Sequence, residues 1–168
     1  SVTISDSQGC DSTFTFAIVN TPFVVSANVV DHISCFGFND GEAIALGPNM
    51  LAVYTYQWGA TSNNQTTETA TNLIPGNHTV TITSAQGCSE TVSVSILEPA
   101  ALTVTATDVS ACVGDLATIS ASASGGTPTY TFAWENSLGQ VQDPIDILVD
   151  QTEIFTVTAT DDNGCVLS

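Results

Sequence analysis

A Gly-Cys dipeptide recurs three times in this chain, as Gly9-Cys10, Gly87-Cys88 and Gly164-Cys165. The cysteines are 78 and 77 residues apart, and each pair follows a Thr-rich run and a polar turn. Similarity at a fixed period is the signature of a tandem array, in which each repeat is one small structural module. The recurrence therefore predicts a series of similar modules and not one compact domain.

Alternating apolar and polar residues predict that the modules are built from β-strands. In the runs 53–58 and 130–134 the aromatic residues fall on one face of an extended chain, and the runs 79–83 and 156–160 alternate in the same way. Further expected strands are 12–19, 23–30, 42–46, 90–97, 101–107 and 116–123. Short strands separated by frequent turns are typical of a β-sandwich. We expect tandem immunoglobulin-like β-sandwich modules of about 77 residues, each with one disulfide.

Two proline junctions divide the chain. Thr21-Pro22 and Glu98-Pro99 lie 77 residues apart, and each introduces an extended run. Proline has no N–H to donate, which favours a stiff, extended connection between modules. We therefore expect residues 1–20 to be the last strands of a preceding module, residues 21–98 a complete module, and residues 99–168 a module without its closing strand.

The five cysteines follow the same period. Cys35 and Cys88 are 53 residues apart, and so are Cys112 and Cys165. We predict that these two pairs form intramodule disulfides and that Cys10 pairs with a cysteine outside this sequence, which accounts for the odd count. The alternative joins Cys10 to Cys35 and Cys88 to Cys112, between adjacent modules, and leaves Cys165 without a partner in this sequence. Either arrangement indicates an oxidising compartment, outside the cell or on its surface.

Charge excludes several classes of function. The chain has no Lys or Arg against 17 acidic residues, a formal charge of −17. Nucleic-acid binding requires cationic side chains that displace counterions from phosphate, and binding to anionic lipid requires them too. No apolar run approaches the ~20 residues of a membrane span. Motifs of catalytic triads and zinc hydrolases are absent from the sequence, and we expect no enzyme activity.

Several motifs together resemble a known family. They are Cys35-x-Gly37, Asp40-Gly41, Tyr54-Thr55-Tyr56-x-Trp58, Pro75-Gly76, Gly87-Cys88 and Glu98-Pro99. This combination is similar to the repeat of large surface adhesins of gliding Bacteroidota. The match covers residues 22–98, and Gly125–Tyr130 extends it into the third module, although residues 111–115 lack the Asp-Gly turn. The resemblance implies immunoglobulin-like or PKD-like sandwiches in long cell-surface filaments, which the phylum's own secretion system exports.

The expected function is structural. We predict a segment of an extracellular filament or adhesin stalk, whose partners are neighbouring modules of the same chain or identical subunits. The alternative is a module of a secreted protein that binds surface glycans or Ca²⁺, and a third reading is an accessory region of a secreted enzyme. The loops 59–71 and 135–150 are the places to look for ligand contacts, because loops at the ends of sandwiches carry function.

Individual residues suggest further sites. Trp58 and Trp134 are expected to be core residues packed on the disulfides, the alternative being a platform for sugar stacking. Carboxylate candidates for Ca²⁺ are Asp40, Glu42, Asp161 and Asp162, although turns with solvated acids are the favoured explanation, and no other cofactor is expected. Candidate glycosylation positions are Ser12, Asn64 and Asn77.

Overall fold

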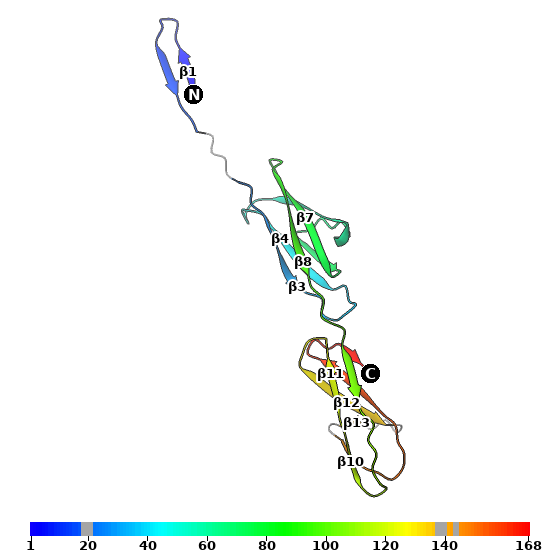
Figure 1. Ribbon diagram of the computed structural model, residues 1–168. Coiled ribbons are helices and arrows are strands. Elements are labelled where there is room, and N and C mark those ends of the chain that lie inside the picture. The colour runs from blue at the N-terminus through cyan, green and yellow to red at the C-terminus, as the bar shows by residue number, and fades with distance from the viewer. Residues whose placement is uncertain (18–21, 137–140, 143–144) are drawn as a thin grey trace.

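The strands of this protein are short and antiparallel. A computed structural model describes residues 1–17, 22–136, 141–142 and 145–168. Within these residues every strand pair is antiparallel, and the only helix is one short 3-10 turn. The all-β prediction is confirmed. Figure 1 shows three groups of strands in chain order, an N-terminal hairpin, a middle unit and a C-terminal unit.

The N-terminal hairpin contains β1 (Val2–Ser5) and β2 (Asp11–Phe14), with Ser5 paired to Asp11 beside the turn. The strand expected over 12–19 is thus shorter than predicted, and its residues 18 and 19 lie outside the described residues. The turn between the strands, residues 6–10, ends at Cys10.

The middle unit, residues 22–98, has two three-stranded sheets. The first has the order β3 (Ser26–Asp31), β4 (Gly41–Leu46), β6 (Thr69–Leu73). The second has the order β5 (Tyr54–Trp58), β7 (Gly76–Ser84), β8 (Ser89–Ile96). The 3-10 turn η1 (Ala60–Ser62) follows β5. Three of these strands, β4, β5 and β8, fall within two residues of the expected runs, and no run was expected for β6. β3 starts three residues later than expected, and β7 extends three residues beyond its expected start.

Both sheets bury side chains in one shared core. The fully buried members are Ala43, Ala45, Trp58, Ala70, Leu73, Val80 and Ile82, with Ile96 almost so. Burial alternates along β4 and β7 because successive side chains of a strand point to opposite faces. Trp58 is 0% exposed, and its Nε1 donates to the carbonyl of Thr67 at 2.9 Å. The prediction that Trp58 is a core residue is confirmed.

The described residues of the C-terminal unit, 99–168, form two two-stranded sheets and one four-stranded sheet. β9 (Thr103–Ala106) pairs with β11 (Ala121–Ser124), and β10 (Leu116–Ile119) pairs with β14 (Ile145–Leu148). The third sheet has the order β13 (Val141–Gln142), β12 (Tyr130–Asn136), β15 (Phe155–Asp161), β16 (Val166–Leu167). The single strand expected over 116–123 is wrong, because the chain leaves one partner at Ser120 and joins another.

The core of the C-terminal unit is smaller than that of the middle unit. Trp134, 5% exposed, and Val157 are its buried centre, which confirms Trp134 as a core residue. A cavity of ≈ 680 Å³ adjoins Trp134, and much of its lining comes from the loops on either side of β10 and β14, within 106–113 and 149–155. β16 pairs with β15 only at Ala159 and Thr160, whereas β7 and β8 pair from Gly76 to Thr83. Among the described residues, β16 therefore covers only the end of one edge of β15, whereas β8 covers most of the corresponding edge of β7.

No helix among the described residues has the length and apolar character needed to cross a membrane.

Candidate functional site: the disulfide junction

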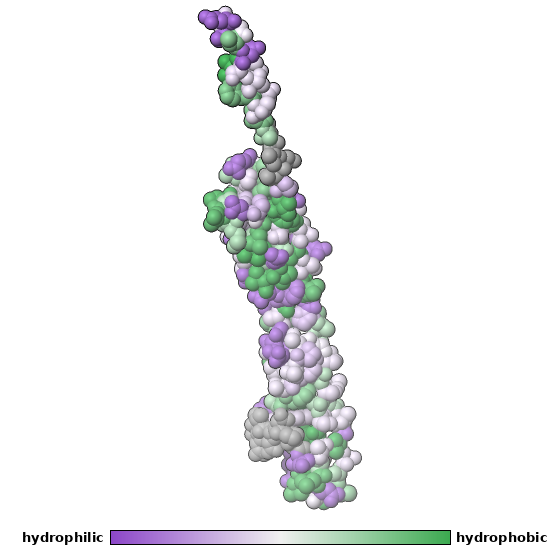
Figure 2. Space-filling model, turned by 90° about the vertical axis from the view of Figure 1, so that its left-hand side faces the viewer, coloured by the Kyte–Doolittle hydropathy of each residue, from purple (hydrophilic) through white to green (hydrophobic). Residues whose placement is uncertain are grey.

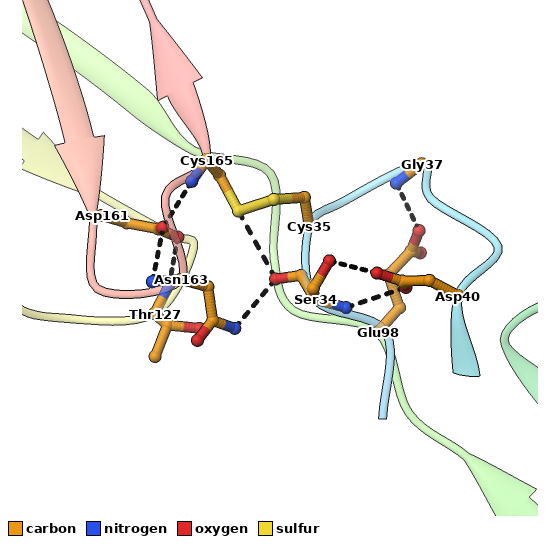
Figure 3. Close-up of a disulfide and its surroundings, with 9 residues drawn as sticks. All are labelled: Ser34, Cys35, Gly37, Asp40, Glu98, Thr127, Asp161, Asn163 and Cys165. Carbon is orange, nitrogen blue, oxygen red and sulfur yellow. Dashed lines mark hydrogen bonds between the residues drawn. A yellow bond between two sulfur atoms is a disulfide. The ribbon is translucent and has the colours of Figure 1, made fainter. Parts of the chain in front are cut away.

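The middle and C-terminal units meet at a disulfide bond. Cys35 and Cys165 are 130 residues apart in sequence, with their Cα atoms 5.7 Å apart. Cys35 follows β3 of the middle unit, and Cys165 precedes β16 of the C-terminal unit (Figure 3). Glu98, the first residue of the peptide linker Glu98-Pro99, lies against the turn of Cys35, where it accepts the N–H of Gly37. Two covalent connections therefore join the units, one through the backbone and one through sulfur.

The predicted disulfides are wrong. Neither Cys35–Cys88 nor Cys112–Cys165 forms, and the alternative pairs Cys10–Cys35 and Cys88–Cys112 do not form either. Cys10, Cys88 and Cys112 are exposed and free. The expectation that each Trp packs on a disulfide of its own module fails with them, since no disulfide lies within a unit.

Strand direction explains the correction. β8 begins directly after Cys88 and ends at Ile96, beside the linker, so that Cys88 lies at the end of the middle unit far from the junction. Eight residues of β-strand span about 26 Å, whereas the Cα atoms of a disulfide lie within about 7 Å. β3 brings Cys35 to the opposite end, the junction. The expected strands 23–30 and 90–97 already implied that Cys35 and Cys88 lie at opposite ends of the unit. The equal cysteine spacings favoured the wrong pairing instead.

A tight turn presents Cys165. The N–H of Asp161 donates to the carbonyl of Cys165 and the N–H of Gly164 donates to that of Asp161, both at 3.0 Å. The carboxylate of Asp161 accepts N–H groups from Cys165 at 2.8 Å, Asn163 at 3.0 Å and Thr127 at 2.7 Å. Asp161 thus fixes the turn from inside and also holds it against the loop of Thr127.

The same contacts control the ionisation of Asp161. The side chain is 5% exposed, and this burial by itself raises the pKa, because a charge in a less polar medium is unfavourable. The backbone N–H groups of Thr127, Cys165, Asn163 and Gly164 outweigh burial and lower the pKa below its ordinary value of 3.8. Asp161 is therefore a carboxylate at neutral pH.

A second turn presents Cys35. The N–H of Phe38 donates to the carbonyl of Cys35 at 3.0 Å, and Gly37 has φ +82°, a conformation that favours glycine. The N–H of Gly37 donates to Oε1 of Glu98 in the linker at 2.7 Å. Cys35 itself is 8% exposed. The turn is therefore tied to the peptide linker as well as to the disulfide.

Ser34 connects the two sides of the junction. Its carbonyl accepts Nδ2 of Asn163 at 3.0 Å and lies 3.4 Å from Sγ of Cys165. Its N–H donates to Oδ1 of Asp40 at 3.1 Å, and its hydroxyl donates to Oδ2. The hydroxyl bond is the main cause that lowers the pKa of Asp40, and the N–H bond adds to it. The carboxylates of Asp40 and Asp161 both accept hydrogen bonds from N–H or O–H groups, and the chain has no Lys or Arg to pair with them.

The linker is fixed on both sides. In the middle unit, the N–H of Ile33 donates to the carbonyl of Leu97 at 3.0 Å, and the N–H of Leu97 donates to Nδ1 of His32 at 3.1 Å. In the C-terminal unit, the N–H of Gly126 donates to the carbonyl of Ala100 at 2.7 Å. The connection between the units is therefore bonded backbone and not a free hinge.

The calcium candidates do not gather. The carboxylates of Asp40 and Asp161 accept hydrogen bonds on both of their oxygens. Glu42 is half-buried on β4, and Asp162 is exposed on the turn of Cys165. Within the described ranges no group of three or more His, Cys, Asp or Glu side chains is placed to hold a metal ion.

The remaining candidates lie apart from the junction. Ser12, Asn64 and Asn77 are all exposed. Loop 59–71 contains η1 and the start of β6, and loop 135–150, of which residues 137–140 and 143–144 lie outside the described residues, contains β13 and β14. His78 is buried, with Nε2 2.8 Å from the carbonyl of Ile74 and Nδ1 2.7 Å from the hydroxyl of Ser62, and belongs to the core.

No protein-family model matches the chain, and a comparison with curated proteins finds no significant match.

Proposed function

We propose that this chain is a structural segment of a long extracellular filament or adhesin stalk built from tandem immunoglobulin-like β-sandwiches. The observation that carries the proposal is the Cys35–Cys165 disulfide, which joins consecutive units beside their peptide linker. Any disulfide stabilises the chain that it closes, and this one also fixes the position of one unit relative to the next. A chain that must transmit force or keep its reach gains from that fixed position.

Two covalent connections restrict bending and twisting far more than one. Neighbouring domains on a single linker move relative to each other unless their interface is large. Here the hydrogen bonds of Glu98, Ser34 and Asn163 surround the disulfide and resist rotation about it. In Figure 1 the middle and C-terminal units follow one another lengthwise. The two connections therefore restrict bending of the long axis and twisting about it.

Composition supports the same function. Disulfides persist in oxidising compartments, which fits export to the cell surface. A charge of −17 with no cation makes neighbouring chains repel and limits lateral clumping. On the face shown in Figure 2, hydrophobic residues form areas over the middle unit, interrupted by hydrophilic ones. The partners in this proposal are further units of the same chain or identical subunits, and the segment has no catalytic role.

Immunogold electron microscopy of the source cells tests the proposal. An antibody against residues 22–168 should decorate thin filaments outside the cell, and a mild reductant should increase the measured curvature of those filaments. Pre-immune serum on the same cells is the control. Gold confined to the cell interior, or found only on compact secreted particles, would contradict the proposal.

A further inference from the structure

The turn that carries Cys165 is built three times in this chain. We call residues 6–10, 84–88 and 161–165 the Gly-Cys turns. In each, the first N–H donates to the cysteine carbonyl, at 3.0, 2.8 and 3.0 Å, and the glycine N–H donates back to the first carbonyl. The glycines have φ of +84°, +86° and +82°. The first side chain accepts the cysteine N–H, from Asp6, Ser84 or Asp161.

The turn that carries Cys35 is built twice. We call residues 35–38 and 112–115 the Cys-x-Gly turns. The N–H of Phe38 donates to the carbonyl of Cys35, and that of Asp115 donates to the carbonyl of Cys112, both at 3.0 Å. The glycines have φ of +82° and +95°. Cys112 is therefore held by its backbone as Cys35 is, but it is exposed and unbonded.

One polar contact of the bonded pair is also available at the unbonded turns. Nδ2 of Asn163 donates to the backbone carbonyl of Ser34, the residue before Cys35. The matching positions of the other Gly-Cys turns hold Gln8 and Gln86, which carry the same carboxamide donor. The matching acceptor before Cys112 is the carbonyl of Ala111, a backbone group that does not depend on the side chain.

Two of the free cysteines, Cys88 and Cys112, lie at the two outer ends of the joined units. Cys88 precedes β8, which runs to the junction, so Cys88 lies at the far end of the middle unit. Cys112 lies beyond β9, and β15 ends at the junction after starting beside the segment of Cys112. Each joined unit thus has a Gly-Cys turn at its N-terminal end and a Cys-x-Gly turn at its C-terminal end.

We infer that Cys112 is a covalent docking site for the Gly-Cys turn of a further unit, and that Cys88 and Cys10 are the complementary halves of the same joint. Each Cys-x-Gly turn bonds the Gly-Cys turn of the unit that follows it, as Cys35 bonds Cys165. The supply of such a unit rests on the proposed array. The result is a ladder with one disulfide at every junction, which keeps the array connected even where the backbone is cut at a junction.

The bond forms by thiol–disulfide exchange with an oxidant of the disulfide class, such as oxidised glutathione or a dithiol oxidase. The thiolate of Cys112 attacks one sulfur of the oxidant and expels the other as a thiol. The thiolate of the Gly-Cys turn then attacks the mixed disulfide and expels the second thiol. The two cysteines lose two electrons and two protons, and the oxidant disulfide gains them as two thiols.

Disulfide mapping of the protein from its source is the first test. Free thiols are alkylated and the protein is cut before Asp, which isolates Cys112 on the peptide 108–114. We expect this peptide to be bonded to a peptide with a Gly-Cys turn. Alkylated Cys112, or Cys112 bonded to another Cys112, overturns the inference. Filaments seen with alkylated Cys112 would overturn the inference and leave the proposed function standing. Bonded Cys112 without filaments would support the inference and contradict the proposed function.

Two variants of the 168-residue chain test the pairing rule and the source of the partner. One is Cys10→Ser with Cys88→Ser, which keeps Cys112, and the other is Cys112→Ser. In glutathione buffer each should stay monomeric alone. A mixture that forms heterodimers places the partner on a second copy. A mixture that stays monomeric, with Cys112 bonded in the native map, places it in the same polypeptide. Equal dimerisation of each variant alone overturns the rule.

Discussion

At the scale of single residues, the junction depends on carboxylates that bind backbone N–H groups. The chain has no cationic side chain, so Asp161, Asp40 and Glu98 are satisfied by N–H and O–H donors. Hydrogen bonds to a charged group are stronger than those between neutral groups. Two of the four calcium candidates, Asp40 and Asp161, are in this way part of the scaffold that positions the disulfide.

Asp161→Asn should lower the free energy of unfolding of the C-terminal unit by about 2 kcal/mol, since a neutral amide replaces a buried acceptor of three N–H groups. Asp162→Asn, at the exposed neighbour, is the matched control and should change it by less than about 0.5 kcal/mol. Urea unfolding followed by circular dichroism measures both. Equal losses from the two variants would show that the contacts of Asp161 do not matter.

Acid should weaken the same contacts. The folded-state pKa of Asp161 and that of Asp40 lie below 3.8, so these carboxylates are bound by fewer protons when folded than when unfolded. The contribution of these two ionised carboxylates to the free energy of unfolding is present above pH ~4 and is lost as the pH falls through the lowered pKa values. Melting temperature should therefore fall between pH 4 and pH 2, and fall less in Asp161→Asn. A variant with an unchanged acid slope would contradict this account.

At the scale of elements, the loop of Gly125 and Gly126 fixes the linker to the C-terminal unit. A Cβ on Gly125 would lie 1.9 Å from the carbonyl oxygen of Ala101, and its φ is +76°. Gly87 has φ +86° in open space, which separates backbone strain from the steric clash. This difference allows a matched pair of substitutions.

Gly125→Ala should destabilise the protein by about 3 kcal/mol, through strain and displacement of the linker. Gly87→Ala should cost about 1 kcal/mol, because only the strain applies. Thermal unfolding of both variants under one set of conditions makes the comparison. If Gly87→Ala were as costly as Gly125→Ala, the close approach to Ala101 would have no energetic role.

The two tryptophans report on the two cores. Trp58 is 0% exposed, while Trp134 is 5% exposed and adjoins the cavity. With Trp58→Phe, fluorescence reports Trp134 alone, and with Trp134→Phe it reports Trp58 alone, since the chain has only these two. Acrylamide should quench Trp134 more strongly than Trp58. Equal quenching constants would contradict the difference between the cores.

The sequence predicted elements better than it predicted their connections. Period-two alternation identified β5, β7, β12 and β15, because each has one buried face. It missed the break at Ser120, since residues 116–123 alternate without interruption while their partner strands change. Pairing partners are not encoded in the local pattern of one strand.

At the scale of the whole molecule, the account depends on which cysteines meet. Equal spacings of 53 residues favoured bonds within modules. The two cysteines of each unit, however, lie at opposite ends of that unit, about one strand length apart. The observed bond closes 130 residues and contributes about 5 kcal/mol in the chain-entropy model. It also changes the meaning of the repeat, because the Gly-Cys period becomes the period of the joints between units.

Disulfide mapping of the 168-residue chain, oxidised in glutathione buffer, tests this claim most directly. A protease that cuts before Asp places the cysteines on separate peptides, 6–10, 31–39, 40–107, 108–114 and 162–168. Mass spectrometry without reduction should find 31–39 bonded to 162–168, and a reduced sample should show both free. A bond from 31–39 to 40–107, which contains Cys88, would contradict the joint between units and restore a disulfide within one.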